Sequence, residues 1–158
     1  MHSILISGAA QGIGAATATL FYQHGYKVGI YDVQVEQAEQ LAQQLGEHAK
    51  AGFLDVADYA SWETALAEFS AWAGEINILV NNAGILYSGP FEDTTIAAHH
   101  RTLDINVKGG HERLSCRFPL FKRIFICPHH QSIFSFGDLW PSRFKQLFHQ
   151  QVCSAWPD

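Results

Sequence analysis

The sequence lacks several features that define large classes of protein. It has no run of eighteen apolar residues, so no membrane-spanning segment is expected. No basic leader precedes the first apolar run at Ser3, so no secretory signal is expected. Only 16% of the 158 residues are charged and the formal net charge is −5, which argues against nucleic acid as a partner. The 47% of hydrophobic residues favour one globular domain or most of one.

The composition changes abruptly at Gly109. Up to that residue the chain has 18 alanines, and its 4 Lys/Arg against 12 Asp/Glu give a net charge of −8. From Gly110 onward it has one alanine, a net charge of +3, seven of the eleven phenylalanines and all three cysteines. Three cysteines make no complete disulfide set, so a cytoplasmic location is expected. We therefore predict two segments of different origin, residues 1–109 and a poorly ordered tail of residues 110–158.

The first segment alternates apolar runs with stretches that have helical spacing. Strands are predicted at residues 3–7, 27–31, 51–54 and 76–80, and helices at residues 12–24, 34–45, 58–73 and 99–109. Strands that alternate with helices of this length form a parallel sheet with right-handed crossovers. The predicted fold class is therefore α/β, the N-terminal part of a Rossmann-type doubly wound parallel sheet, truncated and followed by an atypical tail.

A glycine-rich loop joins the first predicted strand to the first predicted helix. It reads Ser7-Gly8-Ala9-Ala10-Gln11-Gly12-Ile13-Gly14. Glycines let a backbone turn sharply and approach a ligand, and a helix N-terminus offers N–H groups and a positive dipole end to a pyrophosphate. The spacing G-x-x-x-G-x-G differs from the G-x-G-x-x-G dinucleotide fingerprint. Alone, the loop is therefore compatible with a phosphate site or with a purely structural turn.

Asp32 ends the second predicted strand, eighteen residues beyond Gly14. A carboxylate at that point can accept hydrogen bonds from the two hydroxyls of an adenosine ribose. A 2′-phosphate would meet like charge there, and no Lys or Arg lies in the loop or next to Asp32. The pattern favours NAD over NADP, and the alternative is a solvated aspartate at a strand end.

Several motifs together resemble the short-chain dehydrogenase/reductase family over residues 3–109. They are the glycine loop, Asp32, Asp55-Val56, Asn81-Asn82-Ala83-Gly84 and Asn106. The resemblance implies that Asp55 bonds the adenine amino group, that Val56 lies against its ring, and that Asn106 is an active-site residue holding a water in a proton relay. The cofactor-binding residues are then expected to be Ser7, Gly8, Gln11, Gly12, Ile13, Gly14, Asp32, Asp55, Val56, Asn82, Ala83 and Gly84.

This resemblance implies an NAD-dependent oxidoreductase acting on a secondary alcohol or ketone. Family members are usually homo-oligomers, and much of the expected interface lies beyond residue 109. Structural alternatives exist for single motifs: Asp55 can be a helix-entry cap, Asn81-Asn82 a turn, and Asn106 a polar residue on a helix face. Residues 1–109 are thus predicted to be an NAD-binding segment.

The catalytic half of the family pattern is missing from the sequence. The family uses a tyrosine with a lysine four residues later, which lowers the tyrosine pKa, and a serine that orients the substrate. No tyrosine follows Tyr87 in this chain. We therefore expect the chain to be inactive as written, and the alternative is a non-catalytic dinucleotide-binding or subunit-interaction fragment.

We hypothesise that a shift of reading frame produced the tail. Read one nucleotide later, the codons of residues 147–152 can encode Tyr-Ser-Thr-Ser-Lys-Phe, which contains the missing Tyr-x-x-x-Lys. The single codon of Trp156, followed by proline, must then become glycine, nine residues after that tyrosine. Our hypothesis is that one extra base lies within the codons of Gly109-Gly110.

The tail also contains residues that could suggest other chemistry. Its metal-capable side chains have no standard zinc spacing, so we predict no metal site; they are His111, Cys116, Cys127, His129, His130 and Cys153. Basic residues among its phenylalanines could mimic a nucleic-acid patch, which we also reject. Residues 123–127 could pair as a strand because Ile124, Phe125 and Ile126 favour strands.

Overall fold

The computed structural model describes residues 1–87, 91–109, 125–126 and 133–134. Its strands are β1 (Ser3–Ser7), β2 (Lys27–Asp32), β3 (Ala49–Phe53), β4 (Ile78–Asn81), β5 (Phe125–Ile126) and β6 (Ile133–Phe134). Its α-helices are α1 (Gly12–Gln23), α2 (Val35–Leu45), α3 (Tyr59–Ala73) and α4 (Ile96–Leu103). A short 3-10 helix, η1 (Phe91–Asp93), precedes α4, and a π-helical turn, η2 (Asp104–Lys108), follows it.

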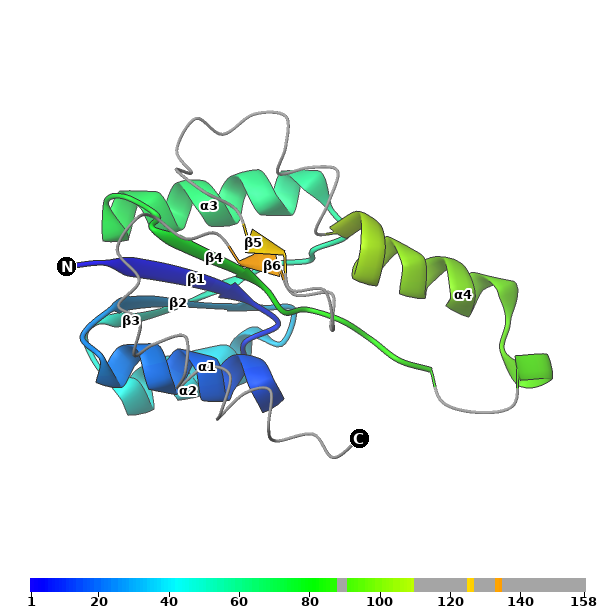
Figure 1. The fold of residues 1–158 in the computed structure, drawn as a ribbon, viewed down its shortest axis with the longest axis horizontal. Coiled ribbons are helices and arrows are strands. Elements are labelled where there is room, and N and C mark those ends of the chain that lie inside the picture. The colour runs from blue at the N-terminus through cyan, green and yellow to red at the C-terminus, as the bar shows by residue number, and fades with distance from the viewer. Residues whose placement is uncertain (88–90, 110–124, 127–132, 135–158) are drawn as a thin grey trace.

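The strands form one sheet in the order β3-β2-β1-β4-β6-β5. The four longer strands are parallel to one another, with α1 and α2 on one face of the sheet and α3 on the other (Figure 1). This confirms the predicted α/β fold of a doubly wound sheet. At one edge, however, β6 pairs with β4 and with β5 in the antiparallel sense. Strand β5 falls within the predicted range of residues 123–127.

Each face of the sheet has its own hydrophobic core. Side chains of β1 and β2 alternate between the faces: Ile4, Ile6, Val28 and Ile30 pack with α1 and α2, while Leu5 and Tyr31 pack with α3. Because both faces are covered, the strands are apolar at successive positions and not at every second one. The central strands are therefore rigid supports for the loops that follow them.

Glycine and aspartate residues mark the ends of the first three helices. Gly25 and Gly46 terminate α1 and α2 with φ of 78° and 114°, in the left-handed region that favours glycine. Asp58 caps α3, its Oδ1 accepting a hydrogen bond of 3.1 Å from the Ala60 N–H. These local signals place the first three helices to within one residue.

Two strand predictions were wrong at their ends. Strand β3 begins at Ala49 and not at residue 51, because its pairing with β2 starts at Val28. The strand lies at the sheet edge and is only half-buried, so Lys50 within it breaks the apolar pattern. Strand β4 begins at Ile78 and not at residue 76; just before it, Asn77 accepts a 2.8 Å hydrogen bond from the Ser3 N–H.

The prediction of a last helix over residues 99–109 was wrong in its start and in assuming one continuous helix type. Helix α4 begins at Ile96, capped by Thr95, which accepts a 3.2 Å hydrogen bond from the Ala98 N–H. Ile96 is 74% exposed, so periodicity of buried residues could not reveal this start. After Leu103 the helix continues as η2. Helix α4 extends away from the sheet (Figure 1), and none of its residues is buried.

Most features predicted in the tail lie outside the described residues, including its cysteines, histidines and residues 147–152. Within the described part of the chain, no helix has the length and apolar character needed to cross a bilayer.

Candidate functional site

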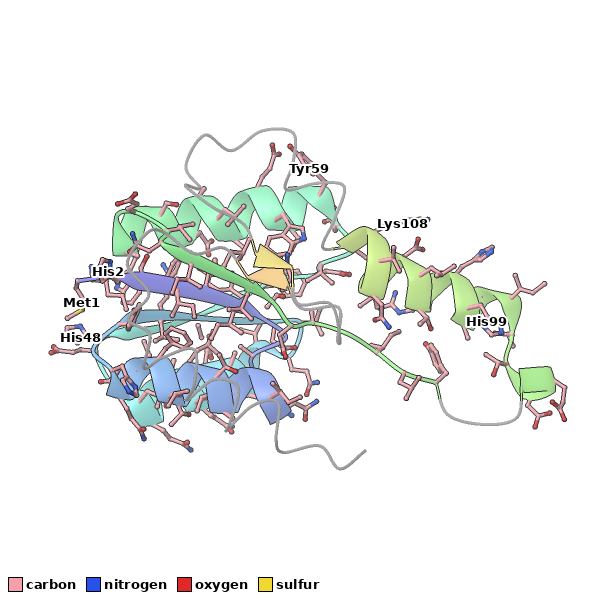
Figure 2. The ribbon with its side chains drawn as sticks, in the orientation of Figure 1. Met1, His2, His48, Tyr59, His99 and Lys108 are labelled. Atoms are coloured by element: carbon pink, nitrogen blue, oxygen red, sulfur yellow. The ribbon has the colours of Figure 1, made fainter. Side chains whose placement is uncertain are left out.

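The candidate site lies where the strand order changes direction. Strands β2 and β3 extend the sheet to one side of β1, and β4 lies on the other side. In open α/β sheets, ligands bind outside the carboxyl ends of the strands at such a switch point. In Figure 2, Met1, His2 and His48 lie at the amino ends of the strands, and Tyr59 and Lys108 lie toward the opposite end. The predicted site residues follow β1, β2 and β4, so they gather at the carboxyl end.

The glycines of the loop serve different purposes. Gly8 has φ of 64°, and a Cβ there would lie 2.6 Å from the Ala83 Cα. A Cβ on Gly14 would lie 2.7 Å from the Asn82 Nδ2. Gly12 has φ of 58° but no heavy atom within 4 Å of a Cβ built there. Gly8 and Gly14 therefore allow the loop to pack against the segment after β4, whereas Gly12 allows the turn alone.

The N-terminus of α1 presents uncapped main-chain N–H groups. Gln11 is the N-cap residue in an extended conformation, and its side chain makes no capping hydrogen bond. The first turn contains no acidic residue, and Ile13 is 45% exposed. An anion at this end of the helix would therefore meet N–H donors and the positive dipole end without a competing carboxylate in that turn.

Ser7 and Asn82 connect the glycine loop to the end of β4. The buried Ser7 Oγ accepts hydrogen bonds from the main-chain N–H groups of Asn82 (3.1 Å) and Ala83 (3.3 Å). The Asn82 Nδ2 donates to the carbonyl oxygens of Gly8 (2.8 Å) and Ser7 (3.2 Å). These side chains therefore fix the position of the loop, and Gly84 follows them at the exposed end.

Asp32 is held by two main-chain donors. Its Oδ2 accepts a 3.0 Å hydrogen bond from the Ala10 N–H, and its Oδ1 accepts one of 3.0 Å from the Gln34 N–H. Only 7% of the residue is exposed, which does not match the alternative of a solvated aspartate. Each carboxylate oxygen has more than one acceptor position, so both can take a further hydroxyl donor. No described residue forms an ion pair with Asp32.

The Asp55-Val56 turn is fixed from the first turn of α3. The Asp55 N–H donates to the Ser61 Oγ (2.9 Å), and the Ala57 N–H donates to the Asp55 Oδ1 (2.9 Å). The Trp62 Nε1 donates to the Val56 carbonyl oxygen at 3.1 Å. Sequence reasoning missed Ser61 and Trp62 as supports of this turn. The available signal was that both lie in the helix turn that immediately follows it.

Asn106 lies in η2 and is paired with the segment after β4. Its Oδ1 accepts a 2.9 Å hydrogen bond from the Ile85 N–H, and its Nδ2 donates to the Ile85 carbonyl oxygen at 2.8 Å. Both polar atoms of the side chain are thus engaged with main chain. A π-helical turn changes the usual backbone pairing, which is typical of functional positions in helices.

The described tyrosines offer poor candidates for acid–base chemistry. Tyr31 is fully buried, and its burial together with the charge of Glu68 raises the pKa of its hydroxyl far above its usual range. Burial also raises the pKa of Tyr26. Tyr87 is 50% exposed in the segment after β4. A catalytic phenol needs the opposite shift, toward neutrality.

Comparisons with known proteins place the chain in a family. The family described as short chain dehydrogenase matches residues 2–120, eleven residues beyond Gly109. Trans-4-hydroxycyclohexanecarboxylate dehydrogenase of Sinomonas cyclohexanicum is 34% identical over 127 residues, covering 75% of this chain and 49% of that protein. D-threitol dehydrogenase of Mycolicibacterium smegmatis is 43% identical over 108 residues, covering 66% and 42%.

A solved structure is similar to the chain in both fold and sequence. The 3-ketoacyl-(acyl-carrier-protein) reductase of Brucella melitensis, crystallised with NADH, superposes with a TM-score of 0.67 at 33% identity. The superposition covers 68% of this chain and 45% of the reductase. The chain thus spans a little under half the length of the proteins it matches. With the family match extending over most of its length, this chain belongs to the short-chain dehydrogenase family.

Proposed function

We propose that residues 1–109 bind NAD as the dinucleotide-binding part of an oxidoreductase that acts on a secondary alcohol or ketone. The observation that supports this most directly is Asp32, a carboxylate held beside the glycine loop by the N–H groups of Ala10 and Gln34. The uncapped end of α1 lies at the same loop and fits a pyrophosphate. A ribose between them would contact both groups.

The described residues fit the remaining parts of the dinucleotide. Asp55 and Val56 form a fixed turn beyond β3, where an adenine would lie with its amino group toward the carboxylate. Ala83 and Gly84 follow β4 on the other side of the switch point, next to Asn106. NAD, when bound, supplies the acceptor for a hydride. The chain supplies the orientation of that acceptor through its loop amides and the two aspartates.

The choice of NAD over NADP rests on charge. A 2′-phosphate at the adenosine ribose would lie against the Asp32 carboxylate, and no described cation forms an ion pair with that group. The Brucella reductase, which was crystallised with NADH, is consistent with a nicotinamide dinucleotide at this site.

The substrate class follows from the relatives. The names of two of them denote dehydrogenases of D-threitol and of a hydroxycyclohexanecarboxylate, both of which are alcohols. In this chain both polar atoms of the Asn106 side chain are paired with the main chain of Ile85, which holds Asn106 beside the segment after β4. No tyrosine follows Tyr87 to exchange the substrate proton. Because general acid–base catalysis contributes about 10²–10⁴-fold, turnover by the chain as written is expected to be small.

A second function is favoured by that same missing tyrosine. The chain would then be a non-catalytic dinucleotide-binding or subunit-interaction fragment. Binding of NADH with no turnover of any alcohol series supports this second function, and measurable turnover by the purified chain supports the first.

Calorimetric titration with NADH and NADPH tests the binding proposal. We expect the wild type to bind NADH more tightly than NADPH. Asp32→Ala should weaken NADH binding by about 10²–10⁴-fold, the equivalent of two charge-assisted hydrogen bonds. Asp93→Ala, which removes an exposed carboxylate from η1, is the matched control and should change neither affinity. Folded wild type that gives no heat with either dinucleotide would refute the proposal.

A further inference from the structure

One indole N–H joins two segments that are distant in the sequence. Trp62 lies in the first turn of α3 and is 2% exposed. Its Nε1 donates to the carbonyl oxygens of Val56 and Gly109, at 3.1 Å in both cases. Val56 belongs to the turn after β3, and Gly109 directly follows η2. We call the Asp55-Val56 turn the adenine-side turn, after the proposed position of the adenine. A single buried donor therefore links the adenine-side turn to the helix that contains Asn106.

The two segments also touch directly. A Cβ on Gly109 would lie 2.9 Å from the Val56 carbonyl oxygen and 3.1 Å from its Cγ2. These distances are too short for a Cβ to fit without a shift of its neighbours. The main chain of Gly109 is therefore packed directly against Val56. The Ser61 Oγ, which accepts from the Asp55 N–H, holds the same turn from its other side. The turn after β3 is therefore in direct contact with the end of the helix.

The helix is held at a second point. Asn106 pairs with the main chain of Ile85 through hydrogen bonds of 2.9 and 2.8 Å. Asn106 and Gly109 are three residues apart, so one turn of helix lies between the contact with Ile85 and the contact with Val56. The position of Asn106 is therefore defined jointly by the segment after β4 and by the turn after β3.

We infer that Trp62 is a positioning residue that couples the adenine-side turn to the helix that contains Asn106. Its N–H fixes the Val56 carbonyl, and through Gly109 it fixes the end of η2. This inference rests on the proposed function, because it assumes that the adenine lies at Asp55 and Val56.

The test replaces Trp62 by phenylalanine, which keeps an aromatic ring and removes the N–H. Trp72→Phe is the matched control, because Trp72 lies in the same helix, with its ring beneath the Lys27 ammonium at 5.3 Å. We titrate AMP and reduced nicotinamide mononucleotide into each variant. Trp62→Phe should weaken AMP binding by about three- to tenfold, the equivalent of one neutral hydrogen bond, and leave the mononucleotide unchanged. Trp72→Phe should change neither affinity.

A purely structural role gives a different result. It would lower the melting temperature of Trp62→Phe while AMP binds the folded protein as tightly as it binds the wild type. That outcome would overturn the inference. An equal loss of affinity for AMP and for the mononucleotide would overturn it too, because the effect would then not be specific to the adenine side.

Hydrogen exchange in the ligand-free protein separates this inference from the proposed function. The amides of residues 103–109 should exchange faster in Trp62→Phe than in Trp72→Phe, because η2 loses the hydrogen bond at Gly109. Those of residues 84–86 should follow, because Asn106 joins them to η2. Equal exchange in the two variants would refute the coupling. If the wild type binds no AMP, the proposed adenine site is wrong, and the exchange rates still decide whether Trp62 links the two segments.

Discussion

The cofactor side and the catalytic side of the candidate site differ in completeness. At the ends of β1 and β2, Asp32 is held by two N–H donors, and the end of α1 offers uncapped amides. Beyond β4, Asn106 is fixed to Ile85, but the sequence contains no tyrosine after Tyr87. A binding site made of main-chain amides and one carboxylate can be complete within consecutive strands and helices. In the family pattern, proton transfer needs a tyrosine with a lysine four residues later, and this sequence has no tyrosine after Tyr87.

The largest expected effect comes from restoring the catalytic side. Removal of one base within the codons of Gly109-Gly110 should replace the tail by a sequence that contains Tyr-x-x-x-Lys. If the cofactor side is already complete, turnover of secondary alcohols with NAD should rise by about 10²–10⁴-fold or more. Absorbance of the reduced nicotinamide measures it.

Resequencing of independent DNA is the control for this prediction. An uninterrupted frame through Gly109-Gly110 would refute the frameshift hypothesis. The family match extends to residue 120. The codons of residues 109–120 are therefore the region to sequence first.

Two glycines on the cofactor side differ in what an added side chain would contact. Gly8→Ala places a Cβ 2.6 Å from the Ala83 Cα at a φ of 64°, whereas Gly12→Ala places one in open space at a φ of 58°. Gly12→Ala should cost about 1–2 kcal/mol of stability from conformation alone. Gly8→Ala should cost about 2 kcal/mol more from overpacking, and should abolish NADH binding. Urea unfolding and calorimetry measure the two effects. Equal losses of stability in both variants would contradict the packing assigned to Gly8.

Sequence reasoning succeeded where the signal is local. The turn between β1 and α1, the end of β2 near Asp32 and the bounds of the first three helices each follow from a few neighbouring residues, because turns and caps depend on short-range geometry. The partners of the site residues could not be predicted. Trp62 contacts Gly109, 47 positions away, and Asn106 contacts Ile85, 21 positions away, so neither pair has a local signal. The start of α4 was missed because Ile96 is exposed and breaks the pattern of burial.

The catalytic side can be weakened at Asn106, through its hydrogen bonds with Ile85. Asn106→Ala removes two hydrogen bonds to Ile85 and leaves its main-chain groups without those partners. We expect a loss of about 2 kcal/mol in the free energy of unfolding. NADH affinity should change little, because the contacts proposed for the adenosine lie on the cofactor side. Thr102→Ala, one turn earlier, should stay within about 0.5 kcal/mol of the wild type. A large loss of NADH affinity in Asn106→Ala would show that the two sides are not separable.

The smallest expected effect is a gain in stability beneath the cofactor side. The Tyr31 hydroxyl is buried and has no hydrogen-bond partner among the described residues, while its ring packs edge-on against Phe69 at 6.1 Å. Tyr31→Phe keeps the ring and removes the unpaired hydroxyl, so we expect a gain of about 1 kcal/mol at neutral pH. Tyr87→Phe, at a half-exposed position, is the control and should change stability by less than about 0.5 kcal/mol.

The pH dependence of that gain identifies its cause. The pKa of Tyr31 is raised in the folded state by burial and by the charge of Glu68, so the phenol stays protonated there. In the unfolded chain it ionises above about pH 10, which favours unfolding of the wild type as the pH rises. The advantage of Tyr31→Phe should therefore be constant below that pH and grow above it, as measured by urea unfolding from pH 7 to 11. An advantage that stays flat across this range would mean that the folded protein ionises the phenol as readily as the unfolded chain does. The surroundings of the Tyr31 hydroxyl would then be more hydrated than its burial indicates.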